Sequence, residues 1–195
     1  MRITVTKFGK SELATFLHAL DRKLGSTQSI VVIGGAAAAL NYDSGIRTSD
    51  VDVMTGFSAE IAAAAVEARR ATGLAVAVGP VTVADPPVNY EDRLKSARGL
   101  DFERLAVFFP DKYDLALMKM VRGYQHDLDA IEGIHRRHRL SMRVLVDRFE
   151  AEMGQAIADP RKLRLNMAML VARLYGLKKG QAIAEHWGVL RPKVG

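Results

Sequence analysis

Two aspartates separated by one residue are the strongest chemical signal in the sequence. Asp50 and Asp52 lie in a short apolar segment that we expect to be a strand, so both carboxylates should point to one face. Their backbone positions would be about 7 Å apart, close enough to serve one cation. Neighbouring carboxylates repel each other, and Mg²⁺ relieves that repulsion while keeping sites for water and substrate phosphates. The pair predicts a Mg²⁺ site, although an Asp-x-Asp also occurs by chance.

A glycine pair precedes these aspartates by about fifteen residues. Gly34 and Gly35 directly follow the apolar run Ile30 to Ile33, and an alanine-rich segment that favours helix follows them. Glycines would let a phosphate approach the backbone at the start of that helix, where free N–H groups favour anions. A tight turn with close packing is the alternative interpretation.

The order of these features resembles the opening of the nucleotidyltransferase superfamily related to DNA polymerase beta. The resemblance rests on Val32-Ile33-Gly34-Gly35, on the alanine-rich helix, and on Arg47-Thr48-Ser49-Asp50-Val51-Asp52-Val53. It extends to Tyr90–Leu94, Tyr113–Lys119 and His126–Asp129, where the chain looks like a bacterial branch similar to the AbiEii-type toxins of toxin-antitoxin pairs. The similar part covers residues 28–132.

The resemblance implies an activity and a metal. Members of that superfamily bind a nucleoside triphosphate (NTP) and transfer a nucleotide to an acceptor, which in the toxin branch is typically tRNA. Here Asp50 and Asp52 would hold Mg²⁺. We therefore expect a Mg²⁺-dependent nucleotidyltransferase acting on an RNA or protein acceptor. The alternative is a catalytically inactive module of the same fold that binds RNA or a protein partner.

The resemblance also assigns roles to other residues. The glycine pair would contact the nucleotide phosphates, and Lys119 would neutralise charge on the triphosphate. Asp127 would correspond to the acidic residue associated with catalysis in the toxin branch. Asp127 and Asp129 cannot face the same way on a helix, so at most one faces the site. The resemblance alone favours Asp127, and a helix-capping role is its alternative. Arg47 and Thr48 either order the loop before the aspartates or contact the nucleotide.

Two further questions are left open by the sequence. Polymerase-like relatives carry a third carboxylate on a later strand, and Asp101 and Glu103 are candidates, with exposed strand-entry charges as the alternative. Lys119 and Arg122 are three residues apart on an expected helix and so share a face. An ordinary solvated basic face is the other interpretation of that pair.

Basic residues gather in the last third of the chain. Of the 28 Lys and Arg residues, 13 lie in residues 136–195 together with only 5 of the 22 acidic residues. A basic surface suits a polyanion, and we expect RNA contacts from Arg136, Arg137, Arg139 and Arg143. Arg148 would extend the same surface along the next helix. A solvated helix face and an acidic protein partner such as an antitoxin are the alternatives.

Composition excludes several classes of protein. The chain has 195 residues, 49% hydrophobic and 26% charged, which argues against disorder, and it has no cysteine for disulfides or thiolate metal sites. No apolar run approaches the roughly 20 residues of a membrane span, and the first residues do not resemble a secretory signal. We expect a cytoplasmic protein without a membrane anchor. The P-loop signature is also absent.

Hydrophobic periodicity predicts an α/β (α+β) fold with a small mixed sheet and a helical C-terminal half. We expect a nucleotidyltransferase-like core in residues 1–110 and a helical region packed on it in residues 111–195. The expected strands are 29–33, 47–55, 74–78, 81–83 and 105–109, with a turn at Gly79-Pro80 and an irregular segment at 84–101. The expected helices are 11–24, 36–42, 58–72, 112–121, 125–137, 141–157, 160–175 and 179–187. We expect Ser58 to cap the third of these and Gly73 to end it, and Asp111 to cap the fourth, with Asp114 as the acidic member of a capping-box-like pair.

Overall fold

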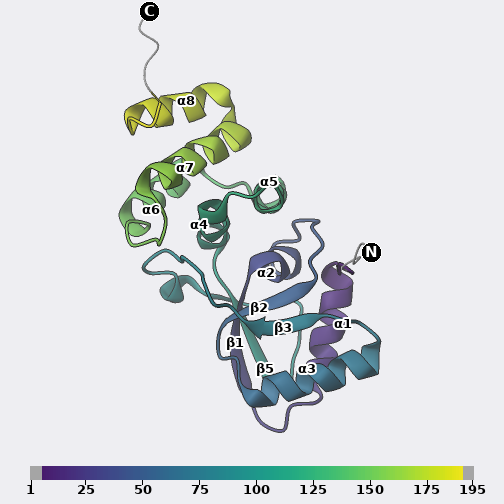
Figure 1. Cartoon of the computed structure of the whole chain (residues 1–195). Helices are drawn as coiled ribbons and strands as arrows, with labels where there is room; N and C mark the ends of the chain where they lie inside the picture. Colours follow the sequence, from purple (N-terminus) through teal and green to yellow (C-terminus); the bar gives the residue numbers. More distant parts are fainter. Residues whose placement is uncertain (1–5, 191–195) are drawn as a thin grey trace, which may run out of the picture.

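A five-stranded mixed sheet organises the first half of the chain in the computed structural model, which describes residues 6–190 (Figure 1). The strands are β1 (Gln28–Ile33), β2 (Asp50–Thr55), β3 (Ala77–Pro80), β4 (Lys95–Ser96) and β5 (Leu105–Phe109), in the spatial order β3-β2-β1-β5-β4. β1 pairs antiparallel with β2 and parallel with β5, β2 pairs parallel with β3, and β4 pairs antiparallel with β5. The predicted mixed α/β fold is confirmed.

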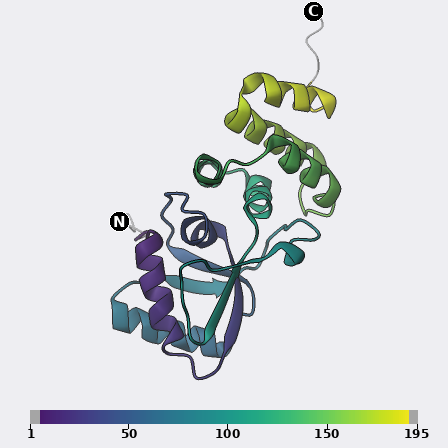
Figure 2. The same cartoon turned by 180° about the vertical axis from the view of Figure 1, so that it is seen from behind.

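Three helices cover one face of this sheet, and five follow it along the chain. The helices are α1 (Lys10–Asp21), α2 (Gly34–Leu40), α3 (Ala59–Thr72), α4 (Lys112–Arg122), α5 (Gln125–His138), α6 (Met142–Glu152), α7 (Pro160–Tyr175) and α8 (Leu177–His186), with a 3₁₀ turn, η1, at Glu91–Arg93. Figures 1 and 2 show α4 and α5 between the sheet and the layer of α6, α7 and α8. Among residues 6–190 no helix has both the length and the apolar character needed to cross a membrane.

The two faces of the sheet differ in their cover. Val32 and Val51 belong to the large apolar cluster formed with α1, α2 and α3. Val31 and Ile33 point to the other face, where Met118 of α4 packs against them. Because strand residues alternate, Asp50 and Asp52 lie on this second, less covered face. The large cluster continues into α4, α5, α6 and α7; the division of the chain at residue 110 stays a prediction.

Capping signals in the sequence mark the helix ends correctly. The Ser58 hydroxyl accepts a hydrogen bond from the backbone of α3, which ends at Gly73 with φ +68°. Asp111 caps α4 in the same way, and Gly123, with φ +65°, ends it. These local signals do not depend on tertiary packing, so periodicity and capping located both helices.

The segment after α3 differs from the prediction. Strands were expected on either side of a Gly79-Pro80 turn, but β3 runs through both residues and no strand forms at 81–83. β3 is an edge strand, so the missing N–H of Pro80 costs no ladder hydrogen bond. The chain then leaves the sheet after the Val81 amide donates to the Val53 carbonyl at 2.9 Å. The segment 84–101, expected to be irregular, contains η1 and β4.

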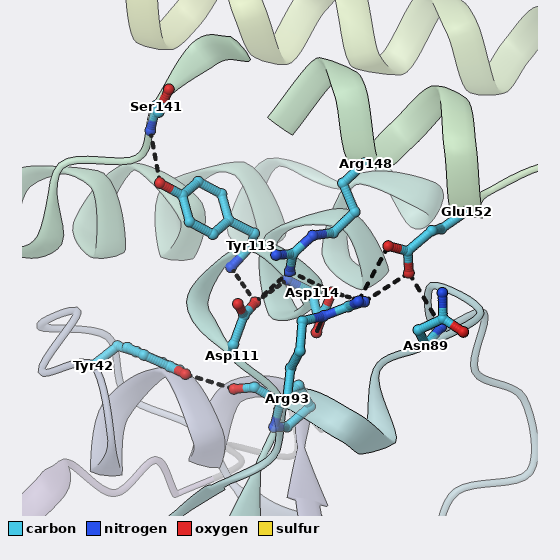
Figure 3. Close-up of polar contacts among 10 residues, drawn as sticks. Tyr42, Asn89, Arg93, Asp111, Tyr113, Asp114, Ser141, Arg148 and Glu152 are labelled. Atoms are coloured by element: carbon cyan, nitrogen blue, oxygen red, sulfur yellow. Dashed lines mark hydrogen bonds and ion pairs between the residues drawn. The ribbon is translucent and has the colours of Figure 1, made fainter. Parts of the chain in front are cut away.

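A buried ion-pair network joins three segments of the chain (Figure 3). We expected Asp114 to act as the acidic partner in a capping box of α4, but its side chain is fully buried and accepts hydrogen bonds from Arg93 of η1 and Arg148 of α6. Arg93 also contacts Glu152 at 2.6 Å. Arg148, which the sequence favoured as part of a polyanion surface, is committed to this network. The network ties η1 and α6 to α4.

Candidate functional site

The aspartate pair lies at the beginning of β2, on the less covered sheet face. Asp52 is paired in register with Ile33 at the end of β1, and both Asp50 and Asp52 are half-buried. Val51 and Val53 are fully buried on the opposite face. The predicted alternation is therefore present, and β2 aims both carboxylates away from the core.

The two glycines at the start of α2 make room for side chains of the aspartate strand. A β-carbon at Gly34, whose φ is +69°, would lie 2.5 Å from Oδ2 of Asp52. A β-carbon at Gly35 would lie 2.6 Å from Oγ1 of Thr48. Real β-carbons do not approach other atoms so closely, so a side chain at Gly35 would displace Thr48, and one at Gly34 would displace the Asp52 carboxylate in addition to straining the backbone. Both still line the cleft described below, which leaves their predicted contact with phosphate as a proposal.

A hydrogen bond orients the Asp50 carboxylate, and burial shifts the pKa of Asp52. Thr48 Oγ1 donates to Asp50 Oδ1 at 2.6 Å, which fixes the orientation of that carboxylate. Burial, followed by the neighbouring charge of Asp50, raises the pKa of Asp52, while Arg122 and Lys119 act in the opposite direction. The pair thus carries the electrostatic cost that a bound cation would relieve.

Helix α4 supplies two cations to the same place. Lys119 is only 3% exposed, so it does not belong to a solvated basic face. Its Nζ lies 3.1 Å from Asp127 Oδ1, and an Nη of Arg122 lies 2.6 Å from the same oxygen. Burial lowers the pKa of Lys119, and the charge of Asp127 opposes that effect. Asp127 therefore holds both cations in position.

The two aspartates of α5 occupy different environments. Asp127 is fully buried beneath Lys119, and its Oδ2 has no hydrogen-bond partner. Asp129, which was not expected to face the site, lines the cleft and accepts hydrogen bonds from Gln125 and Arg173. The geometry makes Asp127 a positioning residue that acts through Lys119 and Arg122.

These side chains meet in a cleft with two halves. The polar half has a volume of about 510 Å³ and is lined by Lys7, Gly35, Ile46, Arg47, Thr48, Ser49, Asp50, Asp52, Lys119, Arg122, His126 and Asp129. The apolar half has a volume of about 340 Å³ and is lined by Ile33, Gly34, Asp52, Pro80, Val81, Thr82, Val83, Ala84, Asp85, Leu115, Met118, Lys119, Val121 and Arg122. Asp52, Lys119 and Arg122 belong to both halves and so mark the centre of the cleft.

The donor set fits a cation that keeps most of its shell for other ligands. Asp50 and Asp52 offer two carboxylates, and the described residues contain no group of three or more His, Cys, Asp or Glu side chains suited to a metal. Mg²⁺ typically binds proteins through one or two carboxylates and completes its octahedron with water and phosphate oxygens. The pair would hold Mg²⁺ in this way.

The candidates for a third carboxylate lie elsewhere. Asp101 and Glu103 precede β5, whose first residue pairs with Gln28 at the beginning of β1, whereas Asp52 pairs at the end of β1. At about 3.3 Å per residue the two places are on the order of 16 Å apart. The neighbours of Asp50 and Asp52 on β3 are Ala77 and Gly79, which carry no carboxylate. Asp101 and Glu103 therefore do not serve this cleft.

Other predicted residues surround the cleft. Arg47 lines the polar half, but its guanidinium is tied to the Lys7 carbonyl and to Glu12 at 2.8 Å each, which orders the loop before β2. Arg136, Arg137, Arg139 and Arg143 are all exposed near the end of α5 and the start of α6. Sequence reasoning placed Arg122 only on the face of Lys119, and it gave no role to His126, which lines the polar half.

A carboxylate pair on a sheet strand, glycines at the start of the preceding helix and cations from a later helix are the features of a nucleotidyltransferase. A family model described as a nucleotidyltransferase of unknown function (DUF6036) matches residues 11–171, and the chain belongs to this family. No curated protein and no solved structure matches the chain. The matched residues include both halves of the cleft except Lys7; the AbiEii-type branch stays a prediction.

Proposed function

We propose that the protein is a Mg²⁺-dependent enzyme that transfers a nucleoside monophosphate from an NTP to an acceptor hydroxyl. The observation that carries the proposal is that Asp52 of β2 faces Lys119 and Arg122 of α4 in one cleft. Carboxylates for a metal and cations for phosphate oxygens then line the same space. Phosphoryl-type transfer depends mainly on such positioning and charge stabilisation.

The reaction forms one bond and breaks one. The acceptor oxygen attacks the α-phosphorus, the bond from that phosphorus to the bridging oxygen breaks, and pyrophosphate leaves with the electron pair while the acceptor proton passes to solvent. Mg²⁺ held by Asp50 and Asp52 would neutralise charge on the phosphates. Lys119 and Arg122 bind the β- and γ-phosphate oxygens, and Asp127 keeps both cations directed at them.

The apolar half of the cleft suits the nucleobase of the NTP. Val81, Met118 and Val121 line it together with other apolar residues, whereas the hydroxyl and charged groups are concentrated in the polar half. A planar base buried against aliphatic side chains loses contact with water at little cost, because its faces are weakly polar. With the base in the apolar half, the triphosphate lies at Asp52 and Lys119, and the polar half is left for the acceptor.

We propose RNA, including tRNA, as the acceptor, because the exposed arginines at the end of α5 offer the charge that a polyanion requires. A protein acceptor is the alternative. The resemblance to AbiEii-type toxins leads us to propose that the activity serves as the toxin of a toxin-antitoxin pair. Growth arrest on expression of the wild-type chain, relieved by Asp50→Asn/Asp52→Asn, would support that role.

A second candidate function is an inactive module that uses the fold only for binding. The observation that favours it is the pair Ala77 and Gly79, which stand beside Asp50 and Asp52 without adding a carboxylate. Transfer of label from an NTP distinguishes the two functions directly, because an enzyme with two carboxylates transfers it and an inactive module does not.

The decisive experiment is incubation with each α-³²P-labelled NTP, Mg²⁺ and total tRNA. The double variant Asp50→Asn/Asp52→Asn should abolish labelling. The matched control, Asp101→Asn/Glu103→Gln, removes the same charge from two exposed residues at the other end of β1 and should label like the wild type. Absence of label with every NTP, together with absence of NTP binding by calorimetry, would overturn the enzymatic function.

A further inference from the structure

Two cavities lie between α5 and the segment that leads into β2. One, of about 400 Å³, is lined by Asp43, Ser44, Gly45, Gly133, Arg136 and Arg137. The other is the polar half of the cleft, whose lining includes residues 46–50 of the same segment and His126 and Asp129 from the first half of α5. Because the same two chain segments line both cavities, we call them together the α5 groove, with its far end at the first cavity and its near end at the aspartate pair.

Close packing explains why the loop follows the helix. A β-carbon at Gly133 would clash with the carbonyl oxygen of Ser44, so α5 approaches the loop backbone directly at this point. The 14 residues of α5 span about 21 Å, which is the length over which the groove can guide a ligand. Figures 1 and 2 show α5 beside α2 and the loop that follows it.

Cations stand at both ends of the α5 groove. Arg136 and Arg137 are exposed at the far end, and Arg122 and Arg47 line the near end. Arg137 lies 3.8 Å from Asp43, but both side chains are more than half exposed, so water screens this pair and leaves the guanidinium able to bind another anion.

Few acidic charges of the α5 groove oppose an incoming anion. Asp129 lies 2.6 Å from Arg173 of α7 and accepts a further hydrogen bond from Gln125. Asp43 is exposed to water, and two arginines, Arg136 and Arg137, line the same cavity. With Asp50 and Asp52 assigned to the metal, the groove presents a positive field to an incoming ligand.

Two aromatic rings lie beside the near end, where His126 lines the cleft and Tyr124 stacks on His126. Tyr124 is 62% exposed although it is a large side chain, and the side chain of His126 is 70% exposed. Their ring centroids are 5.7 Å apart with an interplanar angle of 27°, so the rings are stacked. Exposed stacked rings beside cations are the features with which proteins bind unpaired bases.

We propose that the α5 groove is the track of the acceptor, a single-stranded RNA end. The terminal base stacks on Tyr124 and His126, its hydroxyl is directed at the aspartate pair, and the preceding phosphates contact Arg136 and Arg137. A double helix does not suit this surface because its bases are already stacked on one another. The orientation of the RNA, with its terminal hydroxyl at the aspartate pair, rests on the proposed function, but binding of RNA can be tested without catalysis.

The test is fluorescence anisotropy of a 5′-labelled 12-nucleotide unpaired RNA with the full chain. Tyr124→Ala and Arg137→Glu should each weaken binding about tenfold or more, and Tyr124→Phe should restore it, because stacking needs the ring and not the hydroxyl. Arg137→Ala should also reduce the slope of log affinity against log salt by about 0.7. The matched controls, Leu177→Ala on α8 and Arg161→Glu on α7, remove an equally exposed apolar side chain and arginine outside the groove and should bind RNA like the wild type.

Three results would overturn the proposal: no binding of RNA by the wild type, equal weakening in the control variants, or labelling of a protein in place of RNA in the transfer assay. NTP binding by calorimetry should be unchanged in Tyr124→Ala and Arg137→Glu, because neither residue lines the apolar half. RNA binding through the α5 groove with no transfer of label would support the groove while contradicting the enzyme, so the two proposals fail separately.

Discussion

Lys119 Nζ lies 3.1 Å from Asp127 Oδ1 in an ion pair whose side chains are 4% and 0% exposed. Removing one member of a buried pair leaves the other charge without its partner, at a cost of about 3 to 5 kcal/mol. We therefore expect Asp127→Ala to lower the free energy of unfolding by about 3 kcal/mol, measured by urea denaturation, and to abolish transfer of label.

A double variant separates the stability of this pair from its role in the reaction. Lys119→Met/Asp127→Leu replaces both charges with apolar groups and should recover most of the lost free energy of unfolding, because replacing a whole buried pair is often neutral. It should not recover transfer, because no cation then faces Asp52 from this position. Recovery of activity in the double variant would show that Lys119 has no part in binding phosphate.

Gly34 is required by its conformation and by its neighbour. Gly34→Ala would place a β-carbon 2.5 Å from Oδ2 of Asp52 in a backbone with φ +69°. We expect Asp52 to be displaced and Mn²⁺ affinity, measured by electron paramagnetic resonance as a substitute for Mg²⁺, to fall at least about tenfold.

Gly73 provides the matched control for that variant. Its φ of +68° is nearly the same, but no atom lies within 4 Å of the position of its β-carbon. Gly73→Ala should therefore cost only the backbone strain of about 1 to 2 kcal/mol and leave Mn²⁺ binding unchanged. Equal metal affinities in the two variants would mean that Asp52 is not a ligand.

The sequence was most informative where chemistry and local structure coincide. Alternation placed Asp50 and Asp52 on one sheet face, and the capping signals Ser58 and Asp111 located α3 and α4, because each depends only on residues close in the chain. Asp114 was misjudged as a capping residue because its partners come from η1 and α6, 21 and 34 residues away.

Pairing between strands that are distant in the sequence places Asp101 and Glu103 away from the cleft, which the sequence could not show. They were candidates for a third carboxylate because they directly precede a strand, but that strand, β5, runs parallel to β1, which places them at the opposite end from Asp52. The stacked pair of Tyr124 and His126 had no signal in the sequence, since two aromatic residues two positions apart are unremarkable until a structure shows both exposed beside a cleft.

The wall of the apolar half is expected to depend on Arg93. Its guanidinium lies 3.0 Å from Asp114 and 2.6 Å from Glu152, while the amide of Asn89 donates to the same Glu152 carboxylate (Figure 3). Arg93→Ala should free the segment 81–94 and speed hydrogen exchange at Asn89 by about tenfold or more. Asp92→Ala, at the exposed neighbouring position, should leave that exchange rate as in the wild type.

Asp21 links α1 to the start of β5 through three backbone hydrogen bonds. Its carboxylate accepts from the amides of Glu103, Arg104 and Leu105 at 2.8 to 3.0 Å. Burial raises the pKa of Asp21, but the three amides together lower it below its ordinary value. A carboxylate with a lowered pKa in the folded state stabilises the fold above the ordinary value of about 3.9, and that stabilisation is lost as the pH falls through the lower, folded value.

Asp21→Ala should therefore lower the free energy of unfolding at pH 7 by about 2 to 3 kcal/mol, because three backbone amides lose a charged hydrogen-bond acceptor. The difference from the wild type should shrink progressively below pH 4 as the wild-type carboxylate becomes protonated. Denaturant titrations of the wild type and of Asp21→Ala, repeated at several pH values from 7 downward, would measure this difference in the free energy of unfolding. A difference that stays constant into strong acid would mean that the amides bind the protonated carboxyl equally well, and that charge has no part in holding α1 to β5.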